Sequence, residues 1–392
     1  MGMSGRLARF AAGATRVLVL ESPGDWMLRA TVERAALERG WQLAASPADA
    51  DLLAVCGRPG PDVGALVERV WDQLPGPRAR LDVPDRDAIT SSFERGVQEL
   101  VDAGRQVEDA QRRPSSPDLG DMDHGDMDHG DMDHGDMDHG DMDHGEMDHG
   151  DMDHGDMEMA PGGIPLAEGG PDRDGLEMDV LHLSLGPGLP HWPAGLVLRC
   201  SLQGDVVVAA DARLLDGGRG PAASAGAALA SPDLVPGAQQ LARQVDLVVD
   251  VLALLGWPAA ASAARQVRDL LLAAVVDEEV ATALARLTPL ERRIRRSVVL
   301  RRSLRGIGTI TLGDLGRHGL PESLLGDVRD RLLRAVSHVP REEAPPGGAD
   351  AARSILQVIP DLVSGLDLAA ARLVVASLGF EPSLAHRESA HG

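Results

Sequence analysis

A five-residue unit repeated seven times in tandem carries most of the metal-ligating side chains of this sequence. The repeats run from Asp121 to Gly155; six read Asp-Met-Asp-His-Gly, and the unit beginning at Glu146 has Glu in first place. Each unit combines a thioether, an imidazole and two carboxylates with a glycine that lets the backbone bend. The predicted ligands are His124, His129, His134, His139, His144, His149 and His154, together with Met122, Met127, Met132, Met137, Met142, Met147 and Met152.

The ligand types in the repeat suit copper or nickel. Imidazole with thioether favours copper, above all reduced copper, whereas imidazole with carboxylate favours nickel, zinc or oxidised copper. Successive histidines lie at most about 17 Å apart in an extended segment, and a bend brings two to one ion. Seven near-identical sites predict a buffer or capture device of modest affinity, because ordering the segment costs conformational entropy. The alternative is an inert spacer that arose by expansion of a short DNA repeat.

The acidity of the chain is concentrated around this repeat. The 392 residues carry a formal charge of −23, and the tract from Asp121 to Met159 contains 16 acids and no bases. The remaining 45 acids and 38 bases give only −7, without the strongly basic balance that a nucleic-acid-binding surface needs. We therefore expect no nucleic-acid partner.

Composition divides the chain into two domains and a linker. Residues 112–174 are rich in proline, glycine and acidic residues, so we expect a linker that is disordered in the absence of a ligand. The first domain then spans residues 1–111 and the second spans residues 175–392.

The first domain alternates predicted strands and helices. Its predicted strands are Arg16–Glu21, Trp41–Ala45, Asp51–Cys56 and Ala79–Val83, and its predicted helices are Trp26–Arg39, Pro61–Gln73 and Asp85–Gln111. Continuous apolar strands separated by helices are typical of a small parallel sheet with helices on its faces, which is an α/β fold.

The second domain has the pattern of an α+β fold, with a small antiparallel sheet followed by a helical bundle. Its predicted strands are Met178–Leu185, Gly195–Leu202 and Val206–Leu214, the last two joined by a turn at Gln203-Gly204-Asp205. Predicted helices follow at Gln239–Leu255, Ala259–Val276, Glu278–Leu287, Pro289–Arg305, Pro321–Val336 and Ala351–Leu378, the last broken at Pro360 and Gly365.

Two stretches of the first domain have a recognisable pattern. They are Ala50-Asp-Leu-Leu-Ala-Val-Cys-Gly57 and, after the helical segment at Leu66 to Arg69, Val70-Trp-Asp-Gln-Leu-Pro-Gly-Pro-Arg78. Together they resemble the strand, helix and Tyr-Asp-Gln-Met-Pro-Glu-Pro segment of the 20 kDa subunit-like domain, which forms the small subunits of complex I and of nickel–iron hydrogenases. The resemblance implies a parallel α/β fold.

The start of the second domain resembles a neighbouring subunit. Leu185-Gly-Pro-Gly-Leu-Pro190 and the hairpin from Gly195 to Val207 are similar to the opening of the 49 kDa, hydrogenase large-type subunit of complex I. In that complex the two subunits lie together around the quinone site. The resemblance therefore implies one chain that fuses reduced versions of both, with partners among the subunits of a respiratory or hydrogenase-like complex.

The chain departs from both families where their chemistry resides. The first two cysteine positions of the smaller subunit fall in Glu21–Gly24 and Leu81–Pro84, which contain no thiol, so no iron–sulfur cluster is expected. Leu189 replaces the histidine of the larger subunit's Gly-Pro-x-His-Pro motif, and His191 lies two residues too late to take its place. Paired Cys-x-x-Cys motifs are also missing. The resemblance therefore implies a fold kept without its redox chemistry.

A few other residues are candidates for a role. Cys56 and Cys200 are predicted to be small buried apolar residues of strands, and His182 is predicted to be structural. A basic helical run is either a solvated face or a docking site for an acidic partner or for this chain's own acidic tract. It consists of Arg292, Arg293, Arg295, Arg296, Arg301, Arg302 and Arg305.

The sequence favours a non-catalytic accessory or scaffold protein related to complex I and hydrogenase subunits. One alternative is a copper or nickel protein that binds, stores or delivers the metal through its repeat. A second is an electron-transfer subunit of a NADH–quinone oxidoreductase-like complex. No transmembrane segment is expected, because no stretch has the roughly 18 apolar residues that a span needs. The apolar run from Phe10 to Leu20 is broken by polar residues, so we expect a cytoplasmic protein, peripheral to the inner membrane face through its partner subunits.

Overall fold

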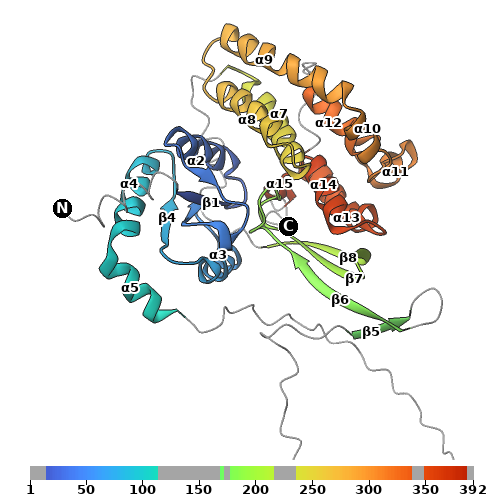
Figure 1. Ribbon diagram of the computed structural model, residues 1–392. Helices are drawn as coiled ribbons and strands as arrows, with labels where there is room; N and C mark the ends of the chain where they lie inside the picture. Colours follow the sequence, from blue (N-terminus) through green and yellow to red (C-terminus); the bar gives the residue numbers. More distant parts are fainter. Residues whose placement is uncertain (1–14, 114–167, 172–176, 216–234, 338–347, 386–392) are drawn as a thin grey trace, which may run out of the picture.

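The computed structural model describes residues 15–113, 168–171, 177–215, 235–337 and 348–385. Figure 1 shows a parallel sheet with its helices in the N-terminal part, and an antiparallel sheet with a larger group of helices in the C-terminal part. This arrangement confirms the predicted α/β and α+β classes. None of the described helices has the length and apolar character needed to cross a bilayer.

The N-terminal sheet is parallel, with strand order β2-β1-β3-β4. The strands are β1 (Arg16–Glu21), β2 (Gln42–Leu43), β3 (Leu52–Cys56) and β4 (Ala79–Val83). All five residues of the central strand β3 are buried, because helices cover both faces of the sheet. The apolar run that predicted β3 therefore reflects its place in the middle layer.

Three helices enclose this sheet and a fourth follows them. The four are α2 (Trp26–Glu38), α3 (Pro61–Gln73), α4 (Ala88–Val101) and α5 (Ala103–Arg112). Helices α2 and α4 share one apolar cluster with the sheet, while α3 packs on the opposite face. Gly40 follows α2 directly and has φ +79°, the left-handed conformation in which many helices end.

The predicted helix Asp85–Gln111 is in fact two helices. Asp102 separates α4 from α5, and its Oδ1 accepts hydrogen bonds from the backbone nitrogens of Gly104 at 3.0 Å and Arg105 at 3.2 Å. The aspartate thus caps a new helix, and local side-chain capping overrides the continuous helical pattern.

The C-terminal sheet is antiparallel, with strand order β5-β6-β7-β8. Its strands are β5 (Glu168–Pro171), β6 (Glu177–Leu185), β7 (Leu196–Gln203) and β8 (Val206–Leu214). The hairpin turn has Gly204 at φ +61°, a conformation that glycine adopts without strain. The predicted linker 112–174 was too long at its end, because residues 168–171 pair with β6 as strand β5.

The helices of the C-terminal part begin after residue 235. They are α7 (Ala238–Leu254), α8 (Pro258–Leu271), α9 (Asp277–Arg296), α10 (Val298–Ser303), α11 (Leu312–His318), α12 (Val328–Val336), α13 (Ala349–Val363), α14 (Leu368–Ser377) and α15 (Pro382–Ala385). The predicted helix Pro321–Val336 begins late, because Gly326, at φ +91°, pairs its backbone with Ile310 before the Asp327–Asp330 capping box starts α12. The short helix α11 was missed, although Thr311 and Asp314 form a capping box at its start.

Two prolines do not break helices as predicted. Pro289 lies inside α9 and is exposed, so solvent can reach the backbone carbonyl that loses its usual donor. Pro360 lies inside α13, and the break falls instead at Gly365, which has φ +79°. The predicted helices Glu278–Leu287 and Pro289–Arg305 are therefore redistributed into α9 and α10.

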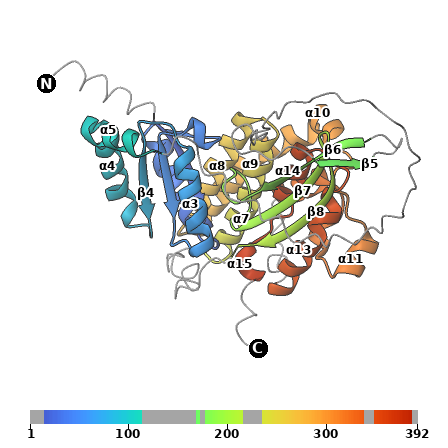
Figure 2. The ribbon, with the colours of Figure 1, turned by 90° about the horizontal axis from the view of Figure 1, so that it is seen from below.

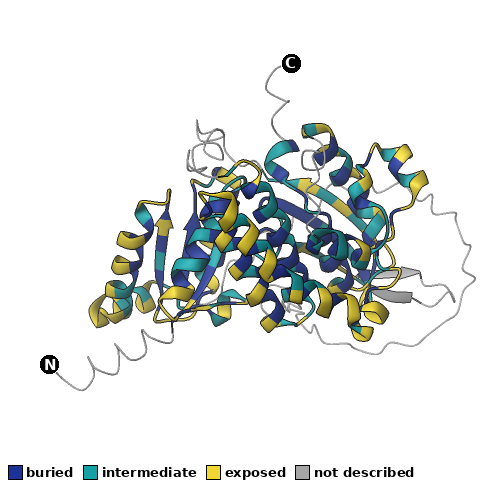
Figure 3. Ribbon diagram, turned by 90° about the horizontal axis from the view of Figure 1, so that it is seen from above, coloured by how far each residue is buried: buried dark blue, intermediate teal, exposed yellow. Residues whose placement is uncertain are grey.

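The two parts share one hydrophobic core. Trp26 and Met27 at the start of α2 belong to the same buried cluster as Trp192, Leu196 and the apolar faces of α7 and α8. In Figure 2 the parallel sheet with its helices lies on the left and the C-terminal helices lie to its right; α2 is the N-terminal helix that contacts α8. In Figure 3 the strands of the parallel sheet are largely in the buried colour, and many exposed residues lie on the outer faces of the helices. Helix α2 is therefore buried on two sides, one against its own sheet and one against α8.

Candidate functional site

The predicted metal ligands of the repeat cannot be placed. His124, His129, His134, His139, His144, His149 and His154, and Met122, Met127, Met132, Met137, Met142, Met147 and Met152, all lie outside the described residues. Within the part of the chain that the structure describes, no group of three or more histidine, cysteine, aspartate or glutamate side chains is arranged to hold a metal ion.

Both cysteines are buried in strands, as predicted. Cys56 ends β3 with no solvent exposure, and Cys200 lies in β7 with 3% exposure. Burial raises the pKa of the Cys56 thiol well above its usual value, and burial also raises that of Cys200. Since the thiolate is the reactive form, both side chains behave as small apolar residues.

The carboxyl end of β1 packs against the C-terminal part. Pro23 follows this strand, and its Cγ would lie only 2.9 Å from a Cβ added to Gly195, a residue with φ +84°. Gly24 likewise lies beside Ser383. The carboxyl end of β1 thus forms part of the contact between the two halves of the chain.

A buried ion cluster joins α2, α7 and α8 beside this contact. We define it as Glu21, Arg29, Glu33, Asp246 and Arg268. Arg29 on α2 donates from Nε to Glu21 Oε2 at 2.6 Å, from Nη1 to Glu33 Oε1 at 2.5 Å, and from Nη2 to Asp246 Oδ2 at 2.5 Å. Its guanidinium thus binds one carboxylate each from β1, α2 and α7.

Arg268 completes the buried ion cluster from α8 and has no side-chain exposure. Its Nη1 donates to Glu33 Oε2 and to Asp246 Oδ1, each at 2.8 Å, and its Nη2 donates to Asp269 Oδ1 at 2.8 Å. Glu33 and Asp246 are therefore each shared by two guanidiniums. Burial favours protonation of Glu33, but Arg29, Arg268 and Arg265 lower its pKa overall.

Two carboxyls, Glu21 in the cluster and Asp25 beside it, have pKa values raised toward neutral pH. Burial raises the pKa of Glu21 to about 7, although Arg29 and Arg243 oppose the shift. Burial and the nearby carboxylate of Glu381 raise the pKa of Asp25 to about 6. Arg243 Nη2 donates to Glu381 Oε2 at 2.9 Å, and its guanidinium lies 5.1 Å from the Trp26 ring centroid. This region can therefore exchange protons in the physiological range.

A histidine–aspartate pair lies on the same helix face as the cluster. His191 Nδ1 is 2.8 Å from Asp250 Oδ1, and Asp250 lies one helical turn after Asp246 on α7. The pair is about one-quarter exposed, and His191 has φ +60°, an uncommon conformation for a residue with a side chain. Arg372 Nη2 donates to the carbonyl of Pro190 at 2.9 Å and so helps to hold this loop.

Sequence reasoning identified none of these groups as a site. Arg29 and Glu33 have the spacing of an ordinary surface pair on a helix, and their partners lie far along the chain. No local feature of α2 marks this pair, because the helix has an even balance of polar and apolar residues. His182, predicted to be structural, is exposed on β6, and its Nδ1 lies 3.0 Å from Ser201 Oγ on β7.

Comparison with models of known protein families finds no match to this chain, and comparison with curated proteins finds none either. Function is therefore inferred from the residues of the chain itself.

Proposed function

We propose that this chain is a non-catalytic accessory or scaffold protein of a respiratory or hydrogenase-like assembly. Its two halves resemble neighbouring subunits, and here they are joined through one core. The main support for the proposal is that the C-terminal half of the chain packs against the carboxyl end of β1. Pro23 packs on Gly195 there, and the buried ion cluster lies alongside, at the position where the family's cluster ligands would begin.

The buried ion cluster supports a scaffold role because it fixes geometry. Arg29 and Arg268 both bind the carboxylates of Glu33 and Asp246, and the directions of these hydrogen bonds fix how α2 lies on α7 and α8. Apolar contacts alone would let the helices slide past one another. A rigid unit of this kind presents a constant surface to partner subunits. The proposed docking elements are the Ala50–Arg78 unit and the loop and hairpin from Pro187 to Val207. Through such partners the protein would lie at the inner face of the membrane.

Co-purification tests the scaffold proposal. The tagged full chain is isolated from membranes solubilised in mild detergent, and its partners are identified by mass spectrometry. We expect subunits of a quinone-reducing or hydrogen-metabolising complex. Recovery of the chain only as a free monomer would count against the proposal. Iron and acid-labile sulfide in stoichiometric amounts would instead support an electron-transfer subunit.

A second candidate function is copper or nickel binding, storage or delivery through the repeat. The seven imidazoles and seven thioethers between Asp121 and Gly155 favour it. Calorimetric titration of the full chain with each metal tests this role, using a chain without residues 121–155 as control. Binding that depends on the repeat should weaken below about pH 6.5, where the imidazoles become protonated. No heat with either metal at neutral pH would exclude it.

A further inference from the structure

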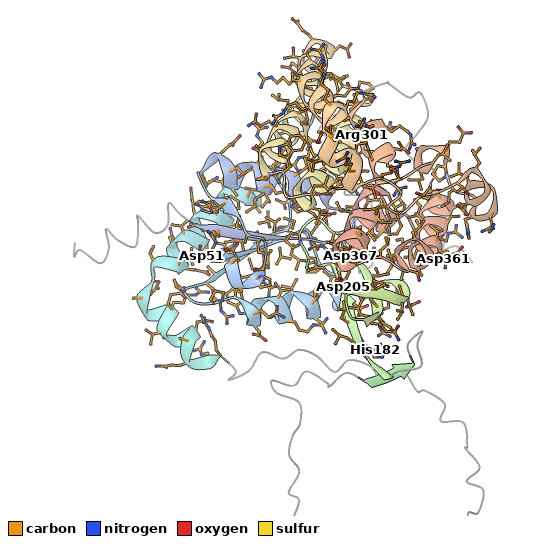
Figure 4. All side chains as sticks on the ribbon, turned by 45° about the vertical axis from the view of Figure 1, so that its right-hand side comes forward. Asp51, His182, Asp205, Arg301, Asp361 and Asp367 are labelled. Atoms are coloured by element: carbon orange, nitrogen blue, oxygen red, sulfur yellow. The ribbon has the colours of Figure 1, made fainter. Side chains whose placement is uncertain are left out.

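The end of α9 and all of α10 present an unusually dense set of exposed arginines. These seven residues are the basic run predicted from the sequence, and all are exposed: Arg292, Arg293, Arg295, Arg296, Arg301, Arg302 and Arg305. Figure 4 labels Arg301 on α10, above Asp205 at the β7–β8 turn and His182 on β6 in that view.

Most of these arginines have no acidic partner. Arg295 pairs with Glu291 at 2.7 Å, and the guanidinium of Arg293 lies 5.1 Å from the Trp257 ring centroid. The remaining five form no salt bridge with any residue in the described ranges: Arg292, Arg296, Arg301, Arg302 and Arg305. We call these five the arginine surface. Arg34 and Arg80, which are only partly exposed, pair with Glu38 and Glu68.

The fold gives only a partial reason for this charge. Arg296 lies in the last turn of α9, where a cation interacts favourably with the helix dipole. That interaction does not require Arg302 or Arg305 as well, and like charges gathered on one surface repel one another. Two large apolar side chains are also exposed at the start of α10, Val298 at 49% and Val299 at 72%. A surface that is both basic and apolar is suited to a ligand that is both acidic and apolar.

We propose that the arginine surface binds the acidic tract Asp121–Met159 of the same chain. The tract supplies 16 carboxylates and no cation, and its methionines could cover the exposed valines. This chemistry matches the surface in sign and in apolar content. Arginine guanidiniums bind carboxylates with paired hydrogen bonds, which gives such a contact more than simple charge attraction.

The tract can reach the surface. His139, near its middle, lies 26 residues beyond Arg113, so an extended segment could span up to roughly 90 Å. A folded body of this size has a radius of gyration of only about 20 Å. A tethered partner also has an effective concentration of about millimolar, so weak individual ion pairs are sufficient.

A nitroxide label in the tract reports the contact directly. The variant Met137→Cys is labelled in the full chain, with Cys56 and Cys200 protected by burial; unsubstituted chain serves to check for label at those sites. In about 0.01 M salt, where the Debye length is about 30 Å, we expect a slow-motion component in the electron paramagnetic resonance spectrum. In about 1 M salt, where the length is about 3 Å, that component should disappear.

Two triple variants separate specific docking from general attraction. R301Q/R302Q/R305Q should abolish the slow component at low salt. R58Q/R69Q/R86Q removes three exposed arginines from the N-terminal part, also without salt bridges in the described ranges, and should leave the slow component intact. Circular dichroism checks that both variants remain folded.

Four outcomes would overturn the proposal. A label that is mobile at low salt in the full chain shows that the tract does not dock. An equal loss of the slow component in both triple variants shows attraction without a site. A slow component that grows with protein concentration assigns the contact to the tract of a second copy. Binding of phosphatidylglycerol vesicles or nucleic acid with a label that stays mobile would assign the surface to those ligands instead.

Discussion

Arg268 is the most deeply buried residue of the ion cluster. Replacing it by Gln would leave Glu33 and Asp246 buried with Arg29 as their hydrogen-bonded cation, while Arg265 and Arg243 stay at 3.6 Å from the two carboxylates. Removing one partner from a buried ionic network typically costs about 3–5 kcal/mol. We therefore expect R268Q to lower the free energy of unfolding by about that amount in urea denaturation.

An exposed ion pair provides the comparison for R268Q. Arg80 bonds Glu68 at 2.6 Å, but the glutamate side chain is 63% exposed. The variant R80Q should therefore change stability by only about 0–1 kcal/mol. Equal losses of unfolding free energy in R268Q and R80Q would show that the buried cluster contributes no more to stability than an exposed ion pair does.

Glu21 and Asp25 should make stability depend on pH near neutrality. Their pKa values in the folded chain, about 7 and about 6, lie above the usual values of 4.5 and 3.8. The folded chain therefore binds more protons than the unfolded chain between about pH 4 and 7. The stabilisation is complete below the unfolded pKa values and is lost as the pH rises through the folded ones. Glu33 does not contribute in this upper range, because it is ionised in both states.

The variant E21Q tests this pH dependence. Gln keeps an oxygen that can accept from Arg29 Nε but removes the titration. We expect unfolding free energies at pH 5 and pH 8 to differ less in E21Q than in the parent chain. The shift from 4.5 to about 7 corresponds to at most about 3 kcal/mol. An unchanged difference would show that Glu21 titrates normally.

At the scale of elements, the loop before β7 is shaped by its contact with the end of β1. Gly195 has φ +84°, and an added Cβ would lie 2.9 Å from Pro23 Cγ. Gly204 in the β7–β8 turn also has positive φ, but an added Cβ there would meet no atom within 4 Å. An alanine at Gly204 therefore introduces backbone strain alone, whereas an alanine at Gly195 introduces both backbone strain and a steric clash.

We expect G195A to destabilise the chain more than G204A. Gly204→Ala should cost about 1 kcal/mol from the left-handed backbone alone, and Gly195→Ala about 1–3 kcal/mol more. Thermal unfolding of both variants measures the difference. Equal midpoints would mean that Pro23 moves aside readily and that the contact between the halves is loose.

At the scale of the whole molecule, the shared core should hold the two halves together without a covalent link. Trp26 and Met27 are buried in the same cluster as the helices α7 and α8, and Arg29 and Arg268 bridge the same boundary. A protease site inserted between residues 160 and 165 allows the link to be cut after folding. We expect the two fragments to co-elute in size-exclusion chromatography. Their separation under native conditions would disprove a shared core.

The ends of a strand or helix were predictable where the residues that fix them lie within the same short stretch of sequence. Strands β1 and β4 and helix α3 have the predicted ends, because an apolar run or a helix-starting proline marks each of them. The hairpin around Gly204 follows for the same reason. Errors arose where a distant contact decided the outcome, as at Gly326, whose pairing with Ile310 delays α12.

The amino-acid sequence by itself determined the order of strands and helices, the concentration of metal-ligating residues in one acidic tract, and the presence of only two cysteines. Only the tertiary structure decided that the two halves share a core and that a buried ion cluster joins them. Asp246 and Arg268 lie 217 and 235 residues from the α2 side chains they bind. Helical periodicity shows which faces are apolar, but the partner of each face is set by packing across the whole chain.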